Sequence, residues 1–156
     1  MSSSTILVLN GPNLNMLGVR EPAVYGRETL DDVRSRTEKR AQTLGLVVDF
    51  RQTNHEGELV SWIQEARGKV AGIILNAGAL THTSIAVQDA LAAAETPVVE
   101  VHLSNIFRRE SFRHHSYVAP LAVGTICGFG PLGYELAVEA IAHHLSSSKP
   151  KPKAGT

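Results

Sequence analysis

The sequence predicts an α/β protein built on an open, doubly wound sheet of five parallel strands, with helices on both faces in three αβα layers. The first observation is a set of five short apolar runs, rich in β-branched residues, as strands covered on both faces are. They are Ile6–Leu9, Leu46–Phe50, Val70–Leu75, Val98–Val101 and Val123–Cys127. The second is that helical patterns separate these runs, which implies right-handed crossovers between parallel strands.

Four segments show apolar residues at helical spacing. They cover residues 30–44, 59–66, 84–94 and 132–145. Gly45 stands where a C′ glycine ends a helix, Pro97 stops the third helix, and Pro131 suits the start of the last. The pattern does not fix the order of the strands in the sheet, and we expect a flavodoxin-like order.

A chain of 156 residues fits one domain, and we place a single catalytic domain at residues 1–145. Residues 146–156 mix Ser, Lys and Pro without an apolar anchor, so a disordered tail is expected, with a basic docking tail as the alternative. The only cysteine, Cys127, excludes an intramolecular disulfide and fits a reducing compartment. We therefore expect a cytoplasmic protein.

The charge balance narrows the class of partner. Basic and acidic residues number 15 each, and the formal net charge is zero. A nucleic-acid partner would require a basic face, so none is expected. No apolar stretch is long enough to span a bilayer, and we expect no membrane association.

Polar side chains follow four of the five predicted strands. They lie in segments 10–15, 54–55, 76–84 and 100–105. In open α/β sheets, ligands bind outside the carboxyl ends of the strands, which meet at one edge. One such cluster would be ordinary turn chemistry, but several at one edge predict a site.

Glu100 and His102 stand two residues apart on a predicted strand, so their side chains project from the same face. A carboxylate beside an imidazole fixes its tautomer, which suits a general acid. The alternative is a buried ion pair that closes the end of a strand. The residues alone leave both readings open.

Residues 18–26 are too polar and interrupted for a strand or helix, and the glycines at both ends suggest a loop that can hinge. Arg20 and Tyr25 can meet there, and a guanidinium favours the phenolate form, which would make Tyr25 a usable base. From the residues alone, an exposed loop tyrosine is the simpler reading.

Residues 108–116 hold three arginines and two histidines. Arginine forks bind carboxylates, although charged loops are usually solvated faces. This one follows directly from Glu100 and His102.

Other signals carry less weight. Residues 128–133 match the G-x-G-x-x-G dinucleotide pattern, but no later strand can supply the acidic ribose partner, so tight packing of helix on sheet explains the glycines better. The histidines show no H-x-x-x-H pairing, so no metal site is expected. No lysine lies at a strand's carboxyl end, which argues against Schiff-base chemistry.

Taken together, four motifs resemble the type II 3-dehydroquinate dehydratases (type II dehydroquinases), and the resemblance runs from Ile6 to Leu145. The motifs are LNGPNLNMLGVREPAVYG, LNAGALTHTS, VEVHLSN and RRESFRHHSY, in that order. The resemblance implies a flavodoxin-like fold, trimers that assemble into a dodecamer, and a lyase that needs no cofactor or metal. The implied reaction is the reversible dehydration of 3-dehydroquinate to 3-dehydroshikimate by anti elimination through an enolate.

The resemblance also implies roles for individual residues. The catalytic positions are Tyr25 as base, Arg20 as the cation that keeps it ionised, Arg109 as its assistant, Asn13 as holder of an enolate-stabilising water, and His102 as acid oriented by Glu100. The substrate-binding positions are Asn76, His82 and Arg113 for hydroxyls, the backbone amides of Leu103 and Ser104 for the carboxylate, and Asp89, which would reach a neighbouring subunit's site.

Two rival readings stay open at this point. A flavodoxin-like oxidoreductase would use the glycines of residues 128–133 for a nucleotide. A non-catalytic receiver-type module would require clustered acidic residues after the first strand, where Asn10 and Asn13 stand instead. Neither rival explains why Tyr25, Arg20 and His102 coincide with the other motifs.

Overall fold

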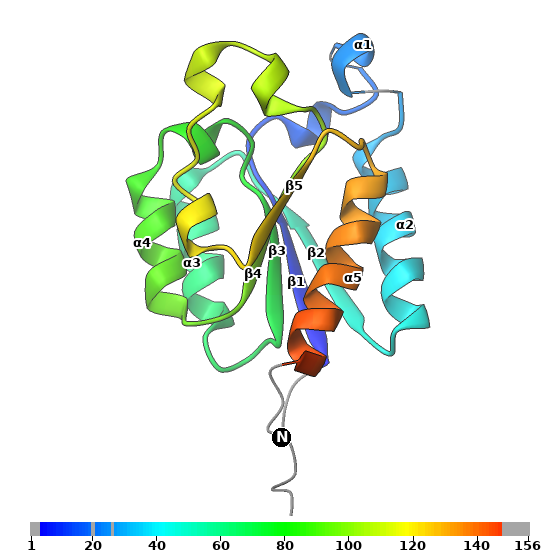
Figure 1. The fold of residues 1–156 in the computed structure, drawn as a ribbon, viewed down its shortest axis with the longest axis vertical. Coiled ribbons are helices and arrows are strands. Elements are labelled where there is room, and N and C mark those ends of the chain that lie inside the picture. The colour runs from blue at the N-terminus through cyan, green and yellow to red at the C-terminus, as the bar shows by residue number, and fades with distance from the viewer. Residues whose placement is uncertain (1–3, 20, 26, 148–156) are drawn as a thin grey trace, which may run out of the picture.

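The computed structural model describes residues 4–19, 21–25 and 27–147. Its sheet has five parallel strands in the order β2-β1-β3-β4-β5 (Figure 1). They are β1 (Thr5–Asn10), β2 (Val47–Gln52), β3 (Gly72–Asn76), β4 (Val98–His102) and β5 (Gly124–Cys127). This is the flavodoxin-like order. The predicted α/β, doubly wound, five-stranded sheet is confirmed.

Helices cover both faces of the sheet. On one face lie α2 (Leu30–Thr43) and α5 (Leu132–Ser147), and on the other lie α3 (Glu56–Ala66) and α4 (Ile85–Ala94). The side chains of β1 point alternately to the two faces of the sheet and so enter two separate hydrophobic cores. Ile6 and Val8 pack with α2 and α5, whereas the intervening side chains pack with α3 and α4. The three-layer prediction is therefore confirmed.

The edge strands differ from the central ones. Every residue of β3 and β4 is buried, as both-face coverage predicts, but Gly124 and Thr125 of β5 are exposed. The hydrophobic content of a run indicates a strand but does not show whether the strand has neighbours on both sides. For this reason the sequence did not distinguish the edge strands from the central ones.

The helix ends follow local chemistry. Thr29 forms a capping box with Asp32 at the start of α2, and Gly45 follows its end with φ 72°, the left-handed conformation expected of a C′ glycine. Ser84 caps α4 by accepting a hydrogen bond from the amide of Val87. Helix α4 ends at Ala94 and is followed by Glu95 in the left-handed conformation with φ 48°. Glu95 lies two residues before Pro97, where the sequence predicted that the helix stops.

Two boundaries require correction. Helix α5 continues through Ser147, so residues 146 and 147 are helical and not part of a disordered tail. Leu145 packs against the core, and this anchors the final turn.

The segment predicted as a loop at residues 18–26 contains one helical turn, α1 (Pro22–Tyr25), which Pro22 favours because its ring presets φ. Residues 148–156 lie outside the described residues. Among the helices that the structure describes, none has the length and hydropathy to cross a bilayer.

Short 3-10 helices occupy several loops at the carboxyl end of the sheet. They are η1 (Leu14–Met16) after β1, η2 (Gly78–His82) after β3, and η3 (Ile106–Arg108) and η4 (Ser111–Arg113) after β4. A fifth, η5 (Ala119–Leu121), precedes β5.

The loops after β1 and β3 pack backbone against backbone. The amide of Gly11 donates to the carbonyl of Asn76 at 2.8 Å, and a Cβ atom at Gly11 would stand 2.3 Å from the carbonyl oxygen of Ala77. On the other side, Gly78 adopts φ 60°, and a Cβ there would be 2.9 Å from the carbonyl oxygen of Pro12. Only glycine permits this approach, which fixes the two loops relative to each other.

We predict that Gly11→Ala lowers the free energy of unfolding by about 3 kcal/mol, because the added methyl group meets backbone that cannot move aside. Gly57→Ala is the matched control, since a Cβ at this exposed position of α3 meets nothing within 4 Å. The control should gain about 0.5 kcal/mol. Denaturant unfolding monitored by circular dichroism measures both, and equal stabilities of the two variants would contradict the prediction.

Candidate active site

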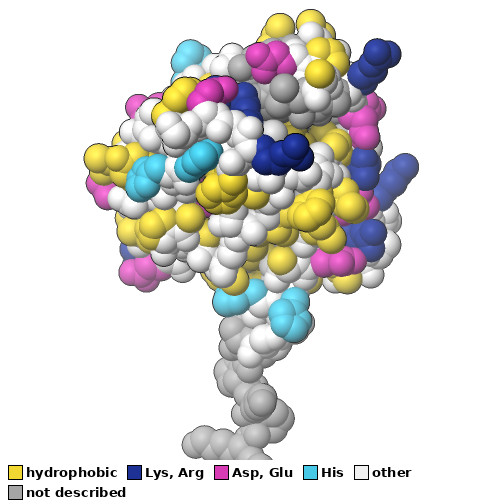
Figure 2. Space-filling view, turned by 45° about the horizontal axis from the view of Figure 1, so that its top comes forward, with side chains coloured by type: hydrophobic (Ala, Val, Ile, Leu, Met, Phe, Trp, Pro, Cys, Tyr) yellow, Lys and Arg dark blue, Asp and Glu magenta, His cyan; other side chains and the backbone are white. Residues whose placement is uncertain are grey.

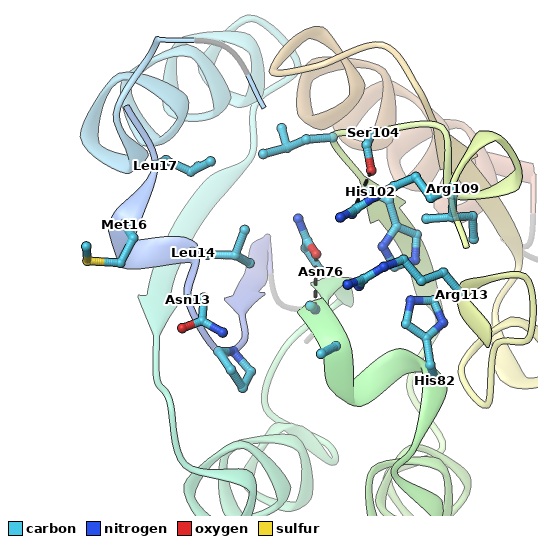
Figure 3. Close-up of a pocket in the computed structure, with 15 residues that line it drawn as sticks. Asn13, Leu14, Met16, Leu17, Asn76, His82, His102, Ser104, Arg109 and Arg113 are labelled. Carbon is cyan, nitrogen blue, oxygen red and sulfur yellow. Dashed lines mark hydrogen bonds between the residues drawn. The ribbon is translucent and has the colours of Figure 1, made fainter. Parts of the chain in front are cut away.

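A pocket opens at the carboxyl end of the sheet, where three loops converge (Figure 3). Its cavity volume is about 90 Å³. The loop after β1 contributes five lining residues between positions 12 and 17, and the end of β3 with its following loop contributes four between positions 76 and 82. The end of β4 with the segment after it contributes six between positions 102 and 113. Strand order reverses between β1 and β3, so the pocket occupies the switch point at which open α/β sheets bind ligands.

Parallel register explains why residues distant in sequence meet here. Asn10 of β1 pairs with Asn76 of β3, and His102 of β4 pairs with Cys127 of β5. Leu75 of β3 pairs with Glu100 of β4, so the ends of the four strands lie within about one residue of the same level. Figure 2 turns this end of the molecule toward the reader and shows arginine or lysine and histidine side chains among apolar ones.

His102 and Glu100 form a buried pair at the end of β4. The Nε2 atom of His102 lies 2.6 Å from Oε2 of Glu100, and the two side chains are 6% and 0% exposed. A carboxylate accepts hydrogen bonds, so Nε2–H donates and the other ring nitrogen remains for the pocket. The predicted pairing on one strand face is present, and it lines the pocket through His102.

Two hydroxyl groups complete the surroundings of Glu100. Ser116 donates to Oε2 at 2.8 Å, and Thr125 of β5 donates to Oε1 at 3.0 Å. Burial would raise the pKa of the Glu100 carboxyl, but the hydrogen bond and charge of His102, together with these hydroxyl groups, outweigh burial and hold the pKa below its ordinary value. Glu100 is thus an ionised, fully bonded anchor for the imidazole. Sequence reasoning missed both hydroxyl donors.

His82 lies beside His102, with the ring centroids 6.3 Å apart and nearly parallel. Its Nδ1 atom is 2.7 Å from the carbonyl oxygen of His115, which can only accept, so Nδ1 carries the hydrogen. Burial lowers the pKa of His82, and the nearby positive charges of His102 and Arg113 lower it further. A neutral ring with this tautomer presents a bare Nε2, which can accept a hydrogen bond from a hydroxyl group.

Two guanidinium groups bring positive charge to the pocket. Arg109 and Arg113 both line it, and Figure 3 shows them extending over the pocket from the segment after β4. Arg113 is held by Glu110 at 2.5 Å and lies over the ring of Phe112, whereas Nη1 of Arg109 is 3.4 Å from Oγ of Ser104. An anionic ligand would be favoured here.

Asn13 and Asn76 supply amide groups from the β1 and β3 loops. Asn13 adopts a left-handed conformation with φ 70°, which asparagine tolerates. The backbone amide of Asn13 donates to Oδ1 of Asn54 at 3.0 Å. Its side chain stands at the pocket rim in Figure 3. Leu103 and Ser104 also line the pocket, directly after His102.

The remaining predicted positions lie elsewhere. Arg20 and the side chain of Tyr25 are outside the described residues, although the turn α1 stands at the same end of the molecule as the pocket (Figure 1). Asp89 is exposed on α4 and does not line the pocket, so its expected contact with a neighbouring subunit stays a prediction.

The family model for class II dehydroquinases, "Dehydroquinase class II", matches residues 4–142. The chain belongs to this family. It is 61% identical over 144 residues to "3-dehydroquinate dehydratase 2" of Pseudomonas aeruginosa, covering 92% of this chain and 97% of that protein. It is also 61% identical over 142 residues to "3-dehydroquinate dehydratase" of Mesorhizobium japonicum, covering 90% and 99% of the two chains.

Solved class II dehydroquinase structures share the fold. The type II dehydroquinase of Propionibacterium acnes superposes with a TM-score of 0.86 at 46% identity, covering 91% of this chain and 98% of that one. The type II dehydroquinase of Butyrivibrio crossotus gives the same TM-score at 40% identity, covering 89% and 97%. The resemblance drawn from the four motifs is confirmed.

Two glycines of residues 128–133 hydrogen bond to the backbone of residues that line the pocket. The amide of Gly128 donates to the carbonyl of His102 at 3.3 Å, and the amide of Gly130 donates to the carbonyl of Leu103 at 2.9 Å. A phosphate-binding loop requires such amides to face a ligand. Here they bond the protein itself, which removes the basis for the nucleotide-binding rival. Among the described residues, no cluster of three metal-ligating side chains occurs.

Thr125→Val tests how Glu100 is held. Removing one donor from a buried carboxylate should lower the free energy of unfolding by about 1–2 kcal/mol at neutral pH. A lowered carboxyl pKa contributes stability that is complete above the ordinary value of 4.5 and is lost as pH falls through the lowered pKa. The difference between wild type and Thr125→Val should therefore shrink below pH 4.5.

Denaturant unfolding at a series of pH values from neutral to acid measures this difference. Thr125→Ser is the control, because it keeps the hydroxyl donor, and it should stay close to wild type. A deficit in Thr125→Val that is the same at every pH would contradict an electrostatic origin.

Proposed function

We propose that this chain catalyses the reversible dehydration of 3-dehydroquinate to 3-dehydroshikimate. Membership of the class II dehydroquinase family and the names of its relatives support the reaction. The observation in the pocket that carries the proposal is the buried pair of Glu100 and His102, open to a cavity with two arginines. This arrangement suits acid-assisted loss of a hydroxyl group from an anionic substrate.

The base is proposed to be Tyr25, kept as phenolate by Arg20 with help from Arg109. Arg109 lines the pocket, and α1, which ends at Tyr25, lies at the pocket's end of the molecule. The phenolate takes the proton beside the ketone, and the electron pair of the broken C–H bond moves to the ketone oxygen to give an enolate. The anion would be stabilised by a water molecule held by Asn13.

His102 is proposed to be the acid. The enolate returns its electron pair to the ring, the bond between carbon and the hydroxyl group breaks, and the imidazolium transfers its proton so that water leaves. Glu100 supports this role because its ionised carboxylate holds Nε2–H and so directs the other nitrogen to the pocket. An acid and a base suffice for this elimination, so the proposed reaction uses no metal or cofactor.

The substrate would be held by groups of matched polarity. His82 offers the bare Nε2 acceptor to a hydroxyl group, and Arg113 brings positive charge. Asn76 would hold a second hydroxyl group, and the backbone amides of Leu103 and Ser104 would hold the carboxylate. The position of these residues around one cavity supports the assignment.

Assembly into trimers and then a dodecamer is part of the proposal. Asp89 supports it, because this exposed α4 carboxylate does not line its own chain's pocket and would be available to the pocket of a neighbouring copy. The mass of the purified protein in solution tests the assembly. A cytoplasmic location remains an expectation from the single cysteine, tested by cell fractionation.

The reaction is tested by incubating purified protein with 3-dehydroquinate in the presence of a metal chelator. The product contains a conjugated enone, so ultraviolet absorbance should rise at a rate proportional to enzyme concentration. Boiled protein is the control. No rise above that control, from protein shown to be folded by circular dichroism, would sink the proposed function.

We predict that Tyr25→Phe and His102→Ala each lower kcat by roughly 10²–10⁴-fold, because each removes one proton-transfer group. Binding of substrate should persist in Tyr25→Phe, since the phenyl ring remains. Steady-state kinetics measure kcat, and calorimetry measures binding.

Matched controls are Tyr117→Phe and His143→Ala, because neither residue lines the pocket. Both should keep wild-type kcat within about threefold, a range far below the loss from a missing acid or base. If Tyr25→Phe and His102→Ala turned over as fast as these controls, the acid and base assignments would be wrong.

A further inference from the structure

Tyr134 on α5 is fully buried, yet its hydroxyl group connects two strands of the sheet beneath the pocket. It donates to Oδ1 of Asn10 at 2.6 Å and accepts from Nδ2 of Asn76 at 2.9 Å. Asn10 and Asn76 are register partners at the ends of β1 and β3. No catalytic or binding role considered above uses the phenol.

Backbone groups at both ends give this chain of hydrogen bonds one direction. The carbonyl of Arg51 can only accept, so Asn10 must turn its NH₂ group toward it, and the two are 2.9 Å apart. The oxygen of Asn10 then faces the phenol, which must donate. The phenol oxygen is left to accept, so Asn76 must turn its NH₂ group toward Tyr134.

The far end agrees with this direction. The amide of Gly78 donates to Oδ1 of Asn76 at 3.2 Å, which requires oxygen on that side. The NH₂ group of Asn76 has a second hydrogen that the bond to Tyr134 does not use. Because Asn76 lines the pocket, this second N–H is a donor available to a ligand.

The glycine pattern after β5 explains how the phenol reaches this point. A Cβ atom at Gly133 would stand 3.3 Å from the side chain of Val101, so glycine lets the start of α5 approach the sheet closely. The next residue is Tyr134. Burial raises the pKa of its phenol, so the hydroxyl group keeps its proton and stays a donor at neutral pH.

We propose that Tyr134 is a positioning residue that fixes the amide of Asn76 so that its free N–H donates to a hydroxyl group of the substrate. The inference rests on the proposed function, in which Asn76 holds such a group. Without the phenol oxygen as acceptor, the amide of Asn76 loses one of the two bonds that define its orientation. An inverted amide would replace this donor by an acceptor, so the substrate hydroxyl group could bind it only by turning its own hydrogen toward it, and binding would weaken.

The test is a double-mutant cycle on KM and kcat with Tyr134→Phe and Asn76→Ala. Tyr134→Phe keeps the buried ring and removes only the hydroxyl group. Alone, it should raise KM roughly tenfold and change kcat less than about threefold, because uniform binding is lost. In the Asn76→Ala background the same change should alter KM less than about twofold.

Ile141→Val is the control for a structural effect. This residue is buried in the same core on α5, and the loss of a methyl group destabilises without touching the chain of hydrogen bonds. Destabilisation alone reduces the active fraction and therefore apparent kcat, not KM. Ile141→Val should keep wild-type KM.

The outcomes separate the inference from the function on which it rests. An inactive wild type would refute the proposed function itself. An active wild type in which Tyr134→Phe keeps normal KM, or in which the effects of the two variants on KM multiply, would overturn the positioning role. Normal KM in Asn76→Ala would overturn it as well.

A second variant covers the case in which Tyr134→Phe does not fold. Asn10→Ser removes the amide oxygen that accepts the phenol's hydrogen, so the phenol could then donate to Oδ1 of Asn76 in competition with the amide of Gly78, and the Asn76 amide would lose its single orientation. The same rise in KM is expected. A folded Asn10→Ser enzyme with normal KM would contradict the proposal.

Discussion

Four polar side chains are buried at the carboxyl ends of β1, β3 and β4, and each must be hydrogen bonded in order to stay there. They are Asn10, Asn76, Glu100 and His102. Glu100 and His102 bond each other, and the other partners are a phenol from α5, a hydroxyl group from β5, and backbone groups from β2 and the loop after β3. The floor of the pocket is rigid because satisfying these groups leaves few alternative arrangements.

Much of the fold followed from sequence because strand and helix periodicities differ. All five strands and four of the helices lie where the apolar patterns placed them, within a few residues. Strand order did not follow, because crossover connections of similar length fit several orders. The extent of α5 was underestimated since Ser146 and Ser147 have little helical preference of their own. The turn α1 was missed because four residues are too few for a period.

The site was predictable where chemistry lies in the loops. Parallel strands bring the segments after β1, β3 and β4 together, so Asn13, His82 and Arg113 converge on one pocket as expected. The side chains that bond the buried Glu100 and Asn76 were not predictable. Thr125 and Tyr134 lie on elements whose patterns indicate only a strand and an apolar helix face. Their side-chain partners become visible only when register and helix packing are known.

The exposure of Thr125 changes what can be expected of an edge strand. Such strands pair with a neighbouring strand on one side only, so their exposed side chains are expected to have few partners. Here Thr125 of the edge strand β5 donates its hydroxyl hydrogen to the carboxylate of Glu100, which is fully buried. Along β5, tolerance to substitution should therefore be uneven, because an exposed residue is constrained by its hydrogen bond to a buried carboxylate on the neighbouring strand.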